Sequence, residues 1–364
     1  MTSPTPSWRA SAGGTLFLAM ARGEAEPTLP PGHGEALAEA WRLAKAQGVL
    51  PLASHFVLNH LQLDWPSAIR DEARKMRDFA LFRNIQLMAM LGKIQKTLEG
   101  GGVPWISMKG PVFTEQYAGS PTLRLSGDLD VLVHPRDAQK ADALLRGMNI
   151  TCSKPIRPAT RWLGVQPHEH SYYSDSPRFL IELHWSLASE CYEIVNSETA
   201  FRRSRIAKVE GGSFPVLSPE DTLLFAAMHS LGHRWSHFYH VKNLDWILHE
   251  TLPGPAGHKN ARTLDWDYIL YAAAKTRKTR ALLLGLSLAR EELGAQLPAS
   301  IQQRIDSDPA LPRLRAQVAR NFLGSGPEKS SWQTLVFKWR ALESGHDRTG
   351  LFLRALVTRL VWRH

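Results

Sequence analysis

The 364-residue sequence is poor in cysteine and has no long apolar run. Cys152 and Cys191 are its only cysteines, and two thiols are too few for a disulfide framework or a four-thiolate zinc site. We therefore expect a reducing, cytoplasmic setting. The apolar stretch 15–21 is short and has no basic segment before it, and arginines interrupt the apolar segment 351–362. Neither stretch is typical of a membrane span, so the sequence predicts none.

Internal repeats are absent as well, whereas charged residues of both signs are plentiful. Lysine and arginine total 44 against 34 acidic residues, which gives a formal net charge of +10. The basic residues are scattered along the chain, so the charge suits a phosphate-bearing substrate as well as a polyanionic partner. A nucleic-acid partner is one alternative, although we do not favour it. The length and the hydrophobic content of 43% are those of a globular protein with two or three domains.

Helical and strand-like patterns divide the chain into three parts. Helical periodicity dominates residues 35–100, and it returns after Ser218, a residue type that commonly begins helices. Between these regions, short apolar stretches alternate with turns. The pattern predicts an α+β protein, with a small mixed β-sheet flanked by N-terminal helices and a C-terminal helical domain. The expected parts are 1–98 for the N-terminal helices, 99–217 for the sheet-containing core and 218–364 for the C-terminal helices.

Four apolar stretches of the core are expected to form strands. They are 103–108, 127–133, 169–174 and 178–185. The sequence Asp175-Ser176-Pro177 is typical of a turn, so the last two stretches predict a hairpin. A Lys109-Gly110-Pro111 turn and a short helix follow the first expected strand, and a helix over 135–148 follows the second.

Two aspartates stand on one face of the second expected strand. Successive side chains of a strand alternate between its faces, so Asp128 and Asp130 project to the same side while Leu129 and Val131 enter the core. Two neighbouring carboxylates repel each other unless a cation neutralises them. Mg²⁺ suits this place because it prefers oxygen ligands from one or two carboxylates and from substrate phosphates. A solvent-facing strand end is the alternative, but the apolar run and Gly127 favour an interior position.

A third carboxylate, Glu182, interrupts an apolar run in the fourth expected strand. Such an acid is costly to bury without a partner. If this strand pairs beside the Asp-x-Asp strand, Glu182 completes a cluster that can hold two Mg²⁺ ions about 3.5–4 Å apart, an arrangement used for phosphoryl transfer. The Lys109-Gly110-Pro111 turn suits phosphate, because glycine allows close approach of the backbone and Lys109 can contact the anion. An ordinary loop is the alternative for that turn.

These motifs together resemble a known family. The matching residues are Lys109-Gly110, Arg124, Gly127-Asp128-Leu129-Asp130 and Glu182-Leu183-His184-Trp185. They are similar to the pattern of the uncharacterised bacterial nucleotidyltransferases, in the superfamily that includes DNA polymerase beta. The resemblance extends from about Phe79 to Asp245. The chain departs from the wider superfamily at its Lys-Gly-Pro turn, where Gly-Gly or Gly-Ser is usual.

The resemblance implies an enzyme that transfers a nucleoside monophosphate from a nucleoside triphosphate to an acceptor, with release of pyrophosphate. Asp128, Asp130 and Glu182 would be its catalytic and metal-binding residues, with two Mg²⁺ ions as cofactor. A helix face with His229 and His233 would line the nucleotide cleft. The residues expected to bind nucleotide are Lys109, Gly110, Arg124, Gly127, His184, Lys242 and Asp245. A small molecule, a peptide and a protein all stay open as the acceptor.

Several of these assignments have structural alternatives. Arg124 could pair with a neighbouring acid, and Lys242 and Asp245 could be buried residues that pack helices together. His184 shares a strand face with Glu182, so it either contacts substrate or supports Glu182. For the whole protein, the alternatives are a kinase-like use of the same metal site and a catalytically silent protein that binds nucleotide or nucleic acid.

Overall fold

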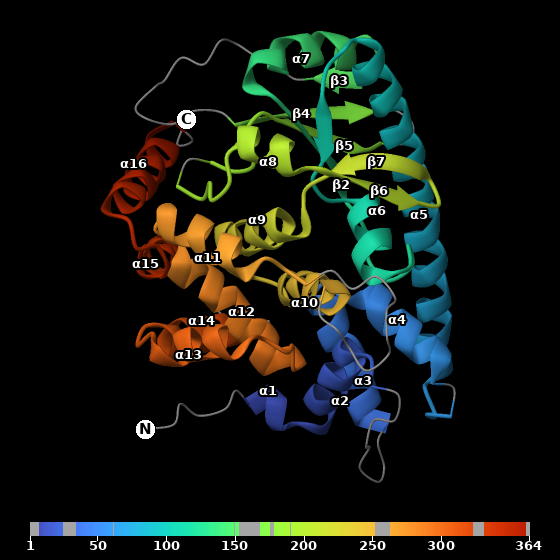
Figure 1. Ribbon diagram of the computed structural model, residues 1–364. Helices are drawn as coiled ribbons and strands as arrows, with labels where there is room; N and C mark the ends of the chain where they lie inside the picture. The colour runs from blue at the N-terminus through green and yellow to red at the C-terminus, as the bar shows by residue number, and fades with distance from the viewer. Residues whose placement is uncertain are drawn as a thin grey trace.

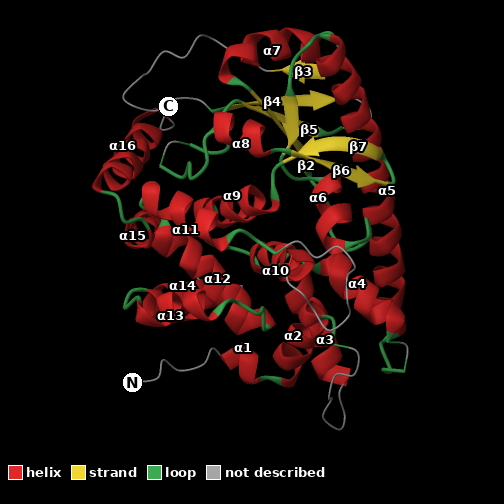
Figure 2. Cartoon of the chain, viewed as in Figure 1, coloured by secondary structure: helices red, strands yellow, loops and turns green. Residues whose placement is uncertain are grey.

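The structure is a computed structural model with an α+β architecture, as the sequence predicts (Figures 1 and 2). It describes residues 7–24, 34–60, 62–148, 150–152, 168–174, 178–189, 191–251, 263–322 and 331–361. Within these residues the strands form one mixed sheet in the order β3-β4-β5-β2-β1-β7-β6. None of the helices in this part of the chain has the length and hydropathy of a membrane-spanning segment.

The centre of the sheet is formed by the strands that the sequence predicts. The seven strands are β1 (Trp105–Ser107), β2 (Asp128–Val133), β3 (Ile150–Cys152), β4 (Glu169–Ser174), β5 (Leu180–His184), β6 (Arg205–Val209) and β7 (Gly212–Val216). Strand β2 pairs antiparallel with β1 and parallel with β5, which in turn pairs antiparallel with β4. The predicted pairing of β4 with β5 is confirmed, although the predicted turn at 175–177 lies outside the described residues. The condition stated for the acid cluster, a pairing of the Glu182 strand beside the Asp-x-Asp strand, is met.

Sequence reasoning missed the strands β3, β6 and β7. The hairpin of β6 and β7 turns at Glu210-Gly211, and β7 joins the sheet in parallel with β1 through Ser107 and Val216. Strand β6 lies at the edge of the sheet, with exposed Arg205 and Ile206. Since an edge strand buries few side chains, its sequence lacks the apolar run by which central strands are recognised.

Helices surround the sheet on both sides and continue beyond it (Figure 1). The long helix α5 runs along the sheet and reaches the N-terminal helices, and α9 to α16 form the C-terminal part. The helices are α1 (Ser7–Ala10), α2 (Ala12–Arg22), α3 (Gly34–Ala46), α4 (Leu50–Asn59), α5 (Ser67–Gly100), α6 (Pro111–Phe113), α7 (Ala138–Arg146), α8 (Ser197–Arg203), α9 (Pro219–Gly232), α10 (Tyr239–Thr251), α11 (Trp266–Lys275), α12 (Thr279–Leu293), α13 (Ala299–Ser307), α14 (Leu311–Asn321), α15 (Ser331–Ala341) and α16 (Gly345–Val361). A π-helical turn, Thr114–Ala118, continues α6.

Two hydrophobic cores occupy the two faces of the sheet. On one face, Leu129 and Val131 of β2 pack with Leu91 of α5 and other apolar residues of α5 and α7. On the other face, Leu132 belongs to a larger core that the N-terminal and C-terminal helices share. The alternation along β2 therefore follows the expected period of two. Asp128 and Asp130 have the same parity as Leu132, so they lie on the face turned toward the larger helical core.

Candidate active site

The register of β2 and β5 brings the predicted acids together. Asp130 lies directly opposite Glu182, and Leu132 lies opposite His184. Because both strands alternate with the same phase, Asp128, Asp130, Glu182 and His184 share one face of the sheet. The Asp130 side chain is 1% exposed, whereas Asp128 and Glu182 are 26% and 21% exposed. The cluster therefore has one fully buried carboxylate and two carboxylates that are partly exposed to solvent.

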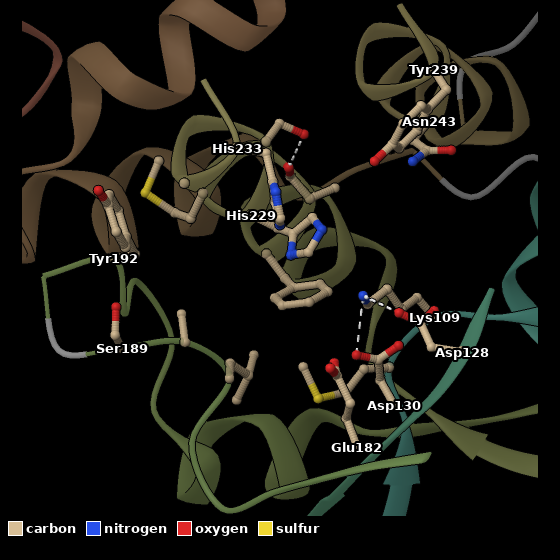
Figure 3. A pocket seen from close by; sticks show the side chains of 18 of the residues that line it. Lys109, Asp128, Asp130, Glu182, Ser189, Tyr192, His229, His233, Tyr239 and Asn243 are labelled. Carbon is tan, nitrogen blue, oxygen red and sulfur yellow. Dashed lines mark hydrogen bonds and ion pairs between the residues drawn. The ribbon is translucent and has the colours of Figure 1, made fainter. Parts of the chain in front are cut away.

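Lys109 supplies a positive charge to this cluster (Figure 3). Its Nζ lies 3.1 Å from Oδ1 of Asp130 and 3.5 Å from Oδ2 of Asp128. Burial alone would lower the pKa of the Lys109 ammonium, but Asp130 and Asp128 outweigh burial and raise it. The pKa of Asp130 is held far below its usual value, because Lys109 and His184 together overcome the opposing effect of burial. The repulsion between the two aspartates is thus relieved by a lysine of the chain itself.

His184 is the second cationic partner of the acids. Its Nε2 lies 3.1 Å from Oδ1 of Asp130 and 3.7 Å from Oε2 of Glu182, and its Nδ1 lies 3.4 Å from Oε2 of Glu169. Burial opposes protonation, but the hydrogen bonds to Asp130 and Glu182 raise the pKa of His184 to about 9. The imidazole therefore supports the carboxylates, which is one of the two roles expected for it.

Gly110, Gly127 and Arg124 also border the cluster. Gly110 adopts φ 89°, and a Cβ atom there would lie 3.2 Å from the backbone oxygen of Asp128, so glycine allows this close approach. A Cβ atom at Gly127 would meet no atom within 4 Å. The Arg124 guanidinium donates to Oγ of Ser126 at 3.1 Å and lies 5.5 Å from the centre of the Phe113 ring. Arg124 thus packs beside the site, and it forms no ion pair with the residues that the structure describes.

The cluster opens into a cavity of about 1150 Å³. This volume exceeds the range of about 300–1,000 Å³ that is usual for small-molecule sites. Lys109, Arg124, Gly127 and all four clustered side chains line it. Apolar side chains from the N-terminal helices and from α9, α15 and α16 form much of the remaining wall, among them Leu50, Met76, Phe225, Leu335 and Phe352. The sheet supplies charge on one side, and the helices supply an apolar enclosure on the other.

The chain is similar to known proteins. The family model described as "Uncharacterised nucleotidyltransferase" matches residues 34–294, which is most of the chain. The chain belongs to this family. A crystal structure of an antigenic nucleotidyltransferase-like protein from Paracoccidioides brasiliensis is similar at 15% identity and a TM-score of 0.33, over 60% of this chain and 95% of that chain. No curated protein matches the sequence.

This nucleotidyltransferase does not bring all the expected nucleotide-binding residues to the cavity. Lys109, Gly127, Arg124 and His184 line it, as do His229 of α9 and His233 directly after that helix. Gly110 and the α10 residues Lys242 and Asp245 do not. The Lys242 ammonium donates to Oδ2 of Asp245 at 2.7 Å, and both side chains are at least 92% buried. Their contact is the helix-packing alternative considered from the sequence.

A neighbouring part of the α10 surface faces the cavity and was missed. Tyr239 and Asn243 both line it and are spaced one helical turn apart. Glu169 of β4 was missed as well, although it contacts His184. The period of α10 was visible in the sequence, but polar residues lie on several sides of this helix outside its apolar stripe of Val241, Leu244 and Leu248. Only the packing of α10 shows which of them reach the cavity.

The acid cluster fits a divalent cation. Asp130, Glu182 and His184 each offer one ligand atom, and these atoms lie within 4.8 Å of one another. Oδ2 of Asp130 is buried and has no hydrogen-bond partner among the described residues. A buried carboxylate oxygen without a partner is costly, and a cation would satisfy it. His184 can act as a ligand only after its ring loses a proton, because an imidazolium has no free lone pair. With its pKa raised to about 9, it is a cationic neighbour of the acids at neutral pH.

Proposed function

We propose that this nucleotidyltransferase transfers a nucleoside monophosphate from a nucleoside triphosphate to an acceptor hydroxyl or phosphate, in a reaction that depends on Mg²⁺. One observation carries the proposal: Asp130 and Glu182 face each other across parallel strands at the wall of a cavity that also contains Lys109. Opposed carboxylates with a buried ammonium suit the binding of a metal–triphosphate complex, because the carboxylates attract the metal ions and the ammonium attracts the phosphates.

Each charged residue has a distinct task in the proposed reaction. Asp128, Asp130 and Glu182 would hold two Mg²⁺ ions, with His184 beside Asp130 and Glu182. When bound, Mg²⁺ neutralises charge on the phosphates and orients the attacking and leaving oxygens. Lys109 lies at the same carboxylates, so its ammonium is placed to contact triphosphate oxygens once metal neutralises the acids. Arg124 adds a second positive charge beside the cavity.

The proposed bond changes follow from this arrangement. The acceptor oxygen forms a bond to the α-phosphorus of the nucleotide while the bond from that phosphorus to the bridging oxygen of pyrophosphate breaks. The acceptor proton passes to the carboxylate of Glu182 and then to solvent. The helices that enclose the cavity would select the acceptor, because they form its walls away from the acids.

Release of labelled pyrophosphate tests the proposal. The protein is incubated with Mg²⁺, with each of the four nucleoside triphosphates and with a cell extract as the source of acceptor. We expect release from at least one nucleotide, and we expect Asp130→Asn and Glu182→Gln to abolish it. Asp71→Asn and Glu198→Gln are matched controls, because these side chains are 63% and 75% exposed. Equal release by wild type and both acid variants would refute the proposed roles.

A further inference from the structure

The side of α10 that faces the cavity carries two side chains with no task in the proposed reaction. Tyr239 begins the helix and Asn243 follows one turn later, so the two lie on the same face. Figure 3 shows them projecting from one helix, across the cavity from Ser189 and Tyr192. Lys242, which pairs with Asp245, does not line the cavity. The face of α10 that lines the cavity is therefore an aromatic ring followed by an amide.

Asn243 has unused hydrogen-bonding capacity. Its Oδ1 is buried and has no hydrogen-bond partner among the described residues. A buried acceptor without a partner costs about 1–3 kcal/mol, so such a group is normally satisfied by water or a ligand. A carboxamide offers an acceptor and a donor side by side. This pair complements adenine, in which an amino group lies next to a ring nitrogen. Cytosine has the same two groups, but its single ring offers an aromatic side chain less area for stacking than a purine does.

The Tyr239 ring is held in a fixed position beside Asn243. Gly48 adopts φ 70°, and a Cβ atom there would lie only 2.8 Å from Cδ1 of Tyr239, so the ring packs directly on the Gly48 backbone. The Tyr239 N–H donates to the carbonyl of Gln47 at 3.3 Å. The ring also contacts His240, with ring centres 4.1 Å apart. A ring restrained on several sides is suited to stacking with a base, because little side-chain freedom is lost on binding.

Positive charge connects this aromatic face to the acids. Arg124 lies within electrostatic range of both Asp128 and Tyr239. A nucleotide whose phosphates bind at the acid cluster and whose base lies at α10 can therefore also contact Arg124. The opposite direction leads to Ser189, Tyr192 and the walls from α15 and α16. The cavity thus has an end for a base at α10 and a separate end for an acceptor.

We infer that Tyr239 and Asn243 form the nucleobase subsite and that the base is adenine. Tyr239 stacks on the base, and the Asn243 amide pairs with its amino group and the adjacent ring nitrogen. The inference rests on the proposed function, since it specifies which nucleoside triphosphate the same site takes. It also predicts a change of base preference that a purely structural role of Asn243 would not produce.

Binding of the α,β-methylene analogues of ATP, GTP, CTP and UTP, measured by calorimetry in Mg²⁺ without acceptor, tests the inference. We expect wild type to bind the adenine analogue about tenfold more tightly than the others. In Asn243→Asp, adenine binding should weaken by about 10- to 100-fold, whereas guanine binding should improve, because a carboxylate accepts from the two adjacent donors of guanine. Tyr239→Leu should weaken all four analogues by about tenfold or more. Circular dichroism verifies that each variant is folded.

Two exposed residues away from the cavity provide matched controls. Asn59→Asp and Tyr271→Leu make the same chemical changes, on α4 and α11, and should leave all four affinities unchanged. Equal affinities for the four analogues in wild type and in Asn243→Asp would overturn the base assignment. The proposed function would then still stand if pyrophosphate is released and Asp130→Asn abolishes the release. No binding of any analogue would overturn the base assignment and the proposed function together.

Discussion

Replacing Lys109 by methionine tests whether its ammonium occupies the place of a metal cation. The side chain is 16% exposed, and its Nζ lies 3.1 Å from Asp130 and 3.5 Å from Asp128. At an effective dielectric constant of about 20, each contact is an attraction of about 5 kcal/mol before desolvation is subtracted. Removing one partner of a buried ion pair typically costs about 3–5 kcal/mol. We expect Lys109→Met to lower the free energy of unfolding by about this amount in EDTA.

Magnesium should restore part of that loss, because a bound cation neutralises the same carboxylates. Urea unfolding in EDTA and in excess Mg²⁺, followed by circular dichroism, measures both effects. Lys278→Met is the matched control: its Nζ lies 3.0 Å from Asp347, the two side chains are 4% and 8% exposed, and Asp347 belongs to no cluster of metal-binding groups among the described residues. The control should lose similar stability and regain none of it with Mg²⁺. If Mg²⁺ stabilises Lys109→Met no more than Lys278→Met, the lysine does not stand at a metal site.

Two further predictions concern His184 and Gly48. Because the pKa of folded His184 is raised to about 9 from 6.5, its stabilising effect is complete below the unfolded value and is lost as the pH rises through about 9. The free energy of unfolding in EDTA should therefore fall by about 3 kcal/mol between about pH 7 and pH 10, and His184→Gln should flatten this dependence. Gly48→Ala should displace the Tyr239 ring and weaken binding of the ATP analogue about tenfold. Gly23→Ala is the matched control: Gly23 has a similar positive φ of 72°, but a Cβ atom there would meet no atom within 4 Å. This variant should suffer the same backbone strain as Gly48→Ala and bind the ATP analogue as tightly as wild type.

The acid cluster was predictable because its local pattern is strict. A strand alternates its side chains, so the spacing of Asp128 and Asp130 determines that they share a face whatever the rest of the chain does. The apolar residues around Glu182 likewise indicate a buried strand. Whether Glu182 meets Asp130 depended on a pairing between strands about fifty residues apart, which was stated as a condition and which the structure confirms.

The partners of the acids were harder to predict. Lys109 was assigned to phosphates from its turn, and its contacts with Asp128 and Asp130 follow from the pairing of β1 with β2. On α10, Lys242 and Asp245 were expected to bind nucleotide because the resemblance to the family extends to their segment. Charge does not tell which side of a helix faces a cavity when its buried side is polar too.

The sequence by itself determined the elements with strong periodic patterns, the face shared by the two aspartates, and the resemblance to the nucleotidyltransferase family. Tertiary structure alone decided that His184 and Lys109 neutralise those acids, that the helices enclose a cavity, and that Tyr239 and Asn243 line it. The physical reason is the distance along the chain between the residues that interact. Backbone geometry repeats over a few residues and can be read from neighbouring positions, whereas a cavity is formed by side chains far apart in the chain, whose contacts depend on how whole elements pack.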